Sequence, residues 1–209
     1  AIFSVGAPVG AMVGAIAAGS LAEAFGWQRT LAIVGAPGLL LAALIWWTVD
    51  EPVRGRFDDG TPHATPVAAI DTARHMARVP TLRHVTIGGV LATLTANGIN
   101  VFAPTYLTRT FSLSIAEAGL WFGLLLGVSG TAGMLAGGSA VARAAARDPR
   151  WYGWLPGIAL FSAMPLYVAA FRQHSLVLAL SCWFLGAALL AAYFPITFAA
   201  AQSLSAPGQ

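Results

Sequence analysis

The chain has 209 residues, of which 57% are hydrophobic and only 9% are charged, and its formal net charge is +3. A soluble domain is usually about 25% charged, whereas runs of about 20 apolar residues cross a bilayer as helices. The composition therefore excludes an ordinary soluble fold, and we attribute the basic balance to arginines held on one membrane face rather than to nucleic-acid binding.

Six apolar runs are each long enough to span a membrane, so the sequence predicts an all-α membrane protein with six transmembrane helices. The runs are 1–22, 30–49, 85–108, 118–142, 151–171 and 175–201. Between the second and third runs lies a polar segment, 50–84, which holds more than half of the charged residues. The chain is thus divided into three parts, 1–49, 50–84 and 85–209.

The first run places Gly6, Gly10 and Gly14 on one helix face, a spacing that lets two helix backbones approach closely in a membrane. A short loop, 23–29, is expected before the second run. Within the polar segment, residues 67–77 have a helical apolar period, which predicts a short amphipathic helix on the membrane surface.

The third run carries polar residues on one face, including Thr93, Asn97, Asn100 and Thr108. An unpaired amide in lipid costs several kcal/mol. This face therefore either makes hydrogen bonds to other helices or lines a wet cavity. Nearby Gly88, Gly89, Gly98 and Pro104 predict an irregular helix, as in transporters near their binding sites.

The fourth run has a longer glycine stripe and is expected to pack tightly against a neighbour. The stripe consists of Gly119, Gly123, Gly127, Gly130, Gly133 and Gly137. The same stripe contains Gly127-Val128-Ser129-Gly130, which matches the Gly-x-Ser-Gly of rhomboid intramembrane proteases. Their catalytic histidine lies in the sixth span, but here His174 lies before that span, so a protease is an alternative that lacks its base.

The arginines predict the orientation. Of the chain's 11 arginines, eight lie in the polar segment or in the turn 143–150, and the other three are Arg29, Arg109 and Arg172. The positive-inside rule places the first group in the cytoplasm and the loops 23–29, 109–117 and 172–174 outside. We therefore expect a multi-pass protein of the plasma membrane, the inner membrane of a bacterium.

The sequence carries no ligand-spaced cysteines, no His-Glu-x-x-His and no phosphate-binding glycine loop. No metal, other cofactor or enzymatic activity is therefore expected. Besides the protease, another alternative is a structural membrane protein that moves no solute.

Two spans, a long cytoplasmic loop and four further spans resemble the fifth to tenth helices of the major facilitator superfamily. Gly26-Trp27-Gln28-Arg29 is similar to the superfamily's Gly-Trp-Arg before its sixth helix. Residues 137–143 resemble its glycine–aspartate–arginine loop motif, with Ala142 in the place of the aspartate. Within the superfamily, residues 50–55 and 104–109 resemble spinster-like transporters.

The resemblance implies a secondary transporter that moves a small organic or lipid-like solute by alternating access, with protons as a coupling ion in many members. The third and sixth spans would line the cavity. The expected substrate-binding residues are Thr93, Asn97, Asn100, Tyr193 and Thr197. Arg143 and Arg147 would belong to the conformational motif at the inner ends of the helices.

Overall fold

A computed structural model of the chain describes every residue except 1, 50–77, 79, 149 and 205–209. The predicted amphipathic helix, 67–77, and most of the polar segment lie outside the described residues. Apart from short connections, the described residues are helical, and they contain six helices long and apolar enough to cross a membrane. The all-α class and the number of spans are therefore confirmed.

The helices follow the predicted runs closely, with one continuous span assembled from three elements. They are α1 (Ile2–Phe25), α2 (Trp27–Thr48), α4 (Pro80–Phe111), α5 (Ile115–Leu124), the π-helical turn η1 (Leu125–Ser129), α6 (Gly130–Ala145), α7 (Trp151–Arg172) and α8 (Leu176–Leu204). The fourth span consists of α5, η1 and α6, which run without a break from Ile115 to Ala145.

The connection between α1 and α2 is a single residue, so the predicted loop 23–29 is wrong. Helix α1 continues to Phe25, and α2 begins at Trp27. Gly26 between them has φ +77°, a conformation that glycine adopts without steric cost. The hydroxyl of Thr30 donates to the Gly26 carbonyl at 2.9 Å, which fixes the start of α2.

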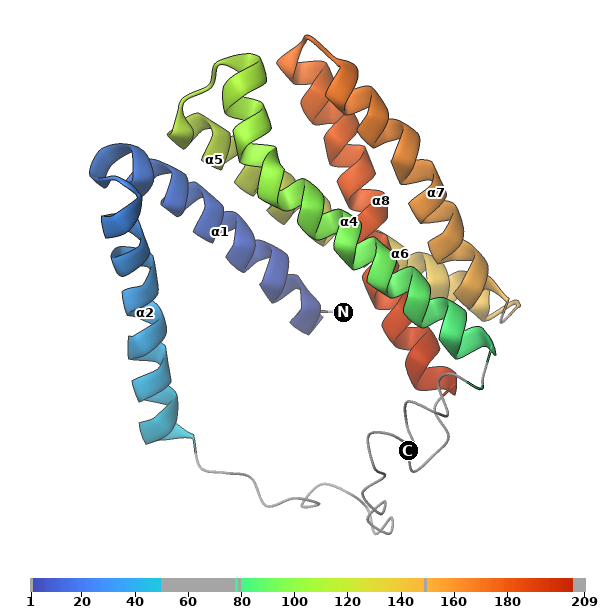
Figure 1. Cartoon of the computed structure of the whole chain (residues 1–209). Coiled ribbons are helices and arrows are strands. Elements are labelled where there is room, and N and C mark those ends of the chain that lie inside the picture. The colour runs from blue at the N-terminus through green and yellow to red at the C-terminus, as the bar shows by residue number, and fades with distance from the viewer. Residues whose placement is uncertain (1, 50–77, 79, 149, 205–209) are drawn as a thin grey trace.

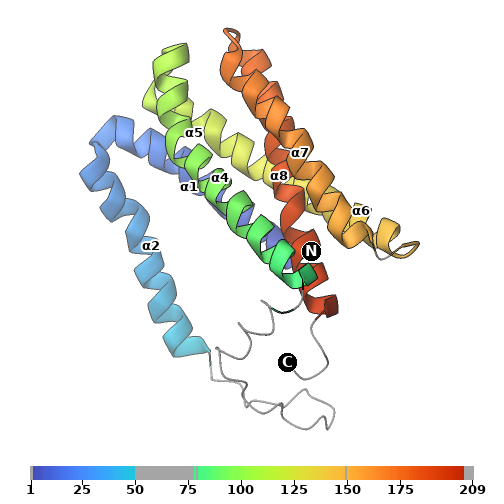
Figure 2. The ribbon, with the colours of Figure 1, turned by 45° about the vertical axis from the view of Figure 1, so that its right-hand side comes forward.

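The connections alternate between two ends of the bundle (Figures 1 and 2). The α1–α2, α4–α5 and α7–α8 connections lie at one end, and the α6–α7 turn and the start of α4 lie at the other. We call the first the outer end and the second the inner end, after the orientation that the arginines predict. Helix α2 stands apart from the other helices and packs only near its start, where Thr30 is buried.

Glycines allow α1 to lie directly against the fourth span. A methyl group added to Gly19 would lie 2.9 Å from Cα of Gly119, and one on Gly119 would lie 2.9 Å from the Ala15 carbonyl oxygen. Further along the same contact, Gly123 faces Ile16. Such short distances leave no room for a side chain, so the two backbones touch, and the tight packing expected of the fourth span is confirmed.

The π-helical turn redirects the glycine stripe from α1 to α8. A π-helical turn takes up one more residue than an α-helical turn, which rotates the following residues by roughly 100° about the axis. Beyond it, Gly133 and Gly137 face the backbone of α8 at Ala188 and Ala192. The fourth span thus packs closely against two different helices.

The stripe predicted on α1 is not the face that packs. Around Gly6, Gly10 and Gly14, a methyl group would meet no atom within 4 Å among the described residues. Helix α1 instead packs through Pro8, which faces Gly130, and through Gly19. These positions lie on the opposite side of the helix at about 100° per residue.

Aromatic side chains tie α4 to the α7–α8 pair at the outer end. The ring of Tyr106 lies edge-on to Phe171, with centroids 4.9 Å apart, and 6.1 Å from the ring of Trp183. The Tyr106 hydroxyl also donates to the carbonyl of Phe171 at 3.3 Å. The fourth span packs on α8 and α4 as well, so the four C-terminal spans form one packed unit.

We predict that Gly19→Ala destabilises the folded chain, because its methyl group would overlap Gly119. Overpacking of such a tight contact lowers the free energy of unfolding by about 1–3 kcal/mol. Gly14→Ala is the matched control on the same helix, where space is open. That control gains up to about 1 kcal/mol from the better helix propensity of alanine. Unfolding of both variants in detergent micelles checks this, and equal stability would contradict the close contact.

Candidate functional site

Helix α4 carries two stripes that differ in their surroundings. Ala92 and Ala103 are buried against other helices, with 6% and 1% of their surface exposed. The predicted polar residues Thr93, Asn97 and Asn100 are exposed. The polar stripe follows the buried stripe by one residue, which corresponds to about 100° around the helix. The predicted binding residues of α4 therefore border the packed core.

The hydrogen bond of Asn97 stays within its own helix. Its Nδ2 donates to the carbonyl oxygen of Thr93 at 2.9 Å. The sequence allowed either a hydrogen bond to another helix or a wet surface. The described contacts of Asn97 do not include a bond to another helix. An exposed amide on a membrane-spanning helix fits the other interpretation, a wet surface.

Tyr193 lies at the interface between α8 and α4. Only 4% of its surface is exposed, and it packs with Ala92 and Leu190. Its hydroxyl oxygen lies over two glycines of α4, because a methyl group on Gly89 would be 2.9 Å from it and one on Gly88 would be 3.8 Å away. Tyr193 thus borders the polar stripe of α4 from the packed side.

The irregularity predicted for the third span is not found. Helix α4 is a continuous α-helix from Pro80 to Phe111, with Pro104 inside it. The glycines Gly88 and Gly89 instead make room for Tyr193. The interruption of helical hydrogen bonding occurs in the fourth span, at the π-helical turn, which is a geometry often found at functional sites.

The remaining predicted residues lie nearer the inner end. Thr197 belongs to α8, one turn after Tyr193, and its side chain is outside the described part. Arg143 lies in the last turn of α6, and Arg147 follows that helix; both are exposed. Cations at this position interact favourably with the carbonyl end of a helix. The structure therefore joins Tyr193 to α4 but does not bring the arginines to that site.

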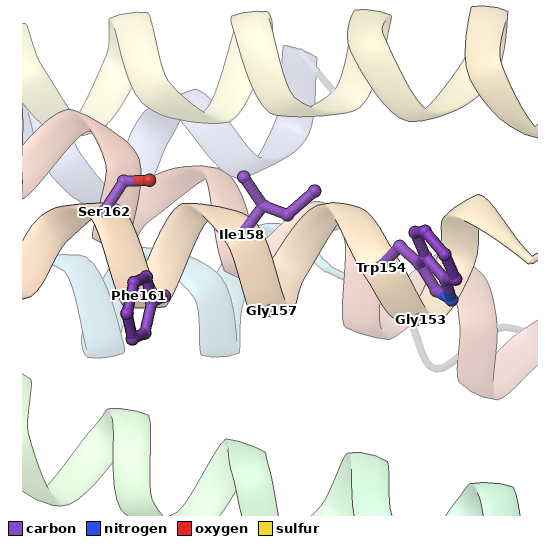
Figure 3. A pocket seen from close by; sticks show the side chains of 6 residues that line it. All are labelled: Gly153, Trp154, Gly157, Ile158, Phe161 and Ser162. Atoms are coloured by element: carbon purple, nitrogen blue, oxygen red, sulfur yellow. The ribbon is translucent and has the colours of Figure 1, made fainter.

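Surface hollows on the described residues lie away from the predicted site. One, of about 360 Å³, follows a single exposed face of α7 (Figure 3). Another, of about 460 Å³, lies between the fourth span and α8. Neither hollow contains a predicted binding residue. The first is lined by Gly153, Trp154, Gly157, Ile158, Phe161 and Ser162.

Ser129 has a local structural partner. It is 1% exposed, and its hydroxyl donates to the carbonyl of Leu125 across the π-helical turn. The two histidines of the described part, His84 and His174, are exposed. The serine thus satisfies a carbonyl within its own helix, and the geometry does not favour the nucleophile that the rhomboid match suggested.

One polar contact at the outer end was missed in the sequence. The carboxylate of Glu23, which was assigned to a loop, belongs to α1 and accepts a hydrogen bond of 2.7 Å from the backbone N–H of Ala116. The two residues are 93 positions apart. The spacing Ser114-x-x-Glu117 is a local signal for the start of α5, but no local pattern identifies a partner on another helix.

Comparison with known proteins gives one consistent result. The sequence profile of the Major Facilitator Superfamily matches residues 1–209. The chain is 29% identical over 212 residues to an MFS-type efflux pump of Mycolicibacterium smegmatis (strain ATCC 700084 / mc(2)155), covering 100% of this chain and 48% of that protein.

Two crystal structures of a bacterial homologue of the human lysosomal transporter Spinster also match, both in inward-facing conformations. The unoccupied form has a TM-score of 0.73 and 27% identity, covering 98% of this chain and 47% of the other. The occupied form has a TM-score of 0.72 and 26% identity, covering 98% and 45%. The chain spans about half the length of these relatives, and the narrower resemblance to spinster-like proteins agrees with them.

We predict that Gly89→Ala weakens the contact between α4 and α8, because the added methyl group would overlap the Tyr193 hydroxyl. Removing that hydroxyl with Tyr193→Phe should partly restore the loss, with a coupling of about 0.5–3 kcal/mol in a double-mutant cycle. Gly98→Ala on the same helix is the control, since no atom lies within 4 Å of that position. Additive effects in unfolding measurements would exclude the contact.

Proposed function

This chain belongs to the Major Facilitator Superfamily, and on that premise we propose that it forms part of a secondary transporter working by alternating access. Membership assigns it to membrane transporters rather than to enzymes. The solute that we propose is a small organic or lipid-like molecule. The relatives are described as an efflux pump and as a homologue of Spinster, which supports this class.

The observation that carries the proposal is the exposed polar stripe of α4. A membrane-spanning helix cannot turn two amides towards lipid without losing several kcal/mol of hydrogen bonding. Asn97 and Asn100 therefore suit a face that meets water and solute. In this proposal their amides bind polar groups of the solute, and Tyr193 and Thr197 border the same cavity from α8.

We further propose that the chain joins two halves of a transporter. Residues 1–49 would be the last two helices of the first half, 50–84 the cytoplasmic central loop and 85–209 the first four helices of the second half. The spans α4 to α8 form one packed unit, which α1 joins along the fourth span while α2 stands apart, and this arrangement supports the division. It also fits a chain of about half the length of its relatives.

The contact between α1 and the fourth span supports the mechanism of rocking. The fourth span presents bare glycine backbone to α1, so no side chain of the fourth span interlocks with α1 at these positions, and one half can tilt on the other. Contact at the outer end corresponds to closure of that side, in agreement with the inward-facing relatives.

We propose a multi-pass location in the bacterial inner membrane, with Arg143 and Arg147 at its cytoplasmic face. We also propose protons as the coupling ion.

We predict that Asn97→Ala with Asn100→Ala in the transporter lowers solute movement about tenfold or more, because each lost hydrogen bond in a solute site costs about 1 kcal/mol. Ethidium efflux from cells and uptake of a fluorescent lysophospholipid into vesicles are the two probes. Thr95→Ala is the control, since Thr95 is an exposed residue of α4 that bonds its own helix at Leu91.

Unchanged transport in the double variant would exclude the proposed cavity wall. If the folded wild-type protein moved neither probe nor any solute in a broader screen, a structural membrane protein would be favoured.

A further inference from the structure

We propose that Glu23 is a positioning residue of the transport cycle, whose carboxylate holds the outer end closed by capping α5 from the neighbouring helix α1. The inference rests on the proposed function, because it assigns the contact to one state of alternating access. It concerns an interaction at the outer end, away from the proposed solute site.

The start of α5 has two different kinds of cap. Within the helix, the Ser114 hydroxyl accepts from the N–H of Glu117 at 3.2 Å, and the Glu117 carboxylate accepts from the N–H of Ser114 at 2.8 Å. The N–H of Ala116 donates instead to Glu23 of α1 at 2.7 Å. Since the first four N–H groups of a helix have no partner in that helix, α1 supplies one of the partners that the start of α5 needs.

A carboxylate suits this position because a helix carries partial positive charge at its N-terminus. A hydrogen bond from a backbone N–H to an ionised acceptor is also stronger than a bond between neutral groups. Glu23 therefore attracts the end of α5 both through its charge and through a directed bond. The other acidic group here, Glu117, bonds within the Ser114–Glu117 turn and does not join the two helices.

The glycine contact explains why Glu23 can reach α5. Gly19 lies four residues before Glu23 and hence on the same face of α1. At that point the backbone of α1 touches Gly119, and the added methyl group on Gly19 would lie 3.0 Å from the carbonyl oxygen of Ile115. This close approach brings the end of α1 beside the first turn of α5.

The two caps respond differently when the outer ends separate. The Ser114–Glu117 cap moves with α5 and survives. The Glu23–Ala116 bond joins two helices that must move apart, so it exists in the closed state alone. An interaction present in one state shifts the equilibrium towards that state, whereas an interaction present in both states does not.

The test compares Glu23→Ala with Glu117→Ala in the full-length transporter. Spin labels at Gln28→Cys and Thr110→Cys, two exposed outer-end positions, report the separation by pulsed electron resonance in a Cys182→Ser background. We expect Glu23→Ala to raise the open-to-closed ratio about two- to fivefold. A change of this size corresponds to the free energy of an exposed charge interacting with a helix end. Glu23→Gln should give a smaller rise, because it keeps an acceptor but loses the charge.

Glu117→Ala should leave the ratio unchanged, although it weakens the same helix end. An unchanged ratio in Glu23→Ala would overturn the proposal, and so would an equal rise in both alanine variants, which would point to general fraying of α5. The distance measurement needs no solute. If the wild type opened and closed but transported nothing, the proposed function would fail while Glu23 could still be seen to hold the closed state.

Discussion

The direct contact of two helix backbones, α1 and the fourth span, is the constraint on which the arrangement depends. Lipid tails are as apolar as the helices, so no hydrophobic effect drives helices together within the bilayer, and association relies on close packing and hydrogen bonds. Gly19 and Gly119 permit the approach, and every larger residue would prevent it. The reach of Glu23 to α5 follows from this one distance, and so does the outer-end closure that we propose.

Helix α4 shows how one membrane helix can combine a structural face and a polar one. Its buried alanines, with the glycines under Tyr193, hold it against α8, while the residues next to them remain exposed. Alanine and glycine are too small to cover the neighbouring amides. The packing that fixes α4 therefore also leaves Asn97 and Asn100 uncovered, and the proposed solute surface needs no separate scaffold.

The sequence predicts the spans well, because the length of apolar runs and the positions of arginines depend on the bilayer rather than on tertiary contacts. It fails where two distant segments decide the outcome. A periodic stripe gives a helix face but not its partner, so Gly6 to Gly14 were expected to pack and Gly19 was overlooked. Likewise, no local pattern shows that one glycine suffices to join α1 to α2, or that Glu23 meets Ala116. The residues proposed for solute binding remain a prediction, since their role depends on what faces α4.

The π-helical turn at Leu125–Ser129 has a consequence for how this protein tolerates changes in length. The turn holds one residue more than regular helix would, and the Ser129 hydroxyl satisfies the Leu125 carbonyl across it. Deletion of a single residue there would restore a regular helix without shortening any loop. It would also turn Gly133 and Gly137 away from α8 and towards α1. In this segment, evolutionary gain or loss of one residue would thus exchange the neighbours of half a helix, a far larger change than most substitutions cause.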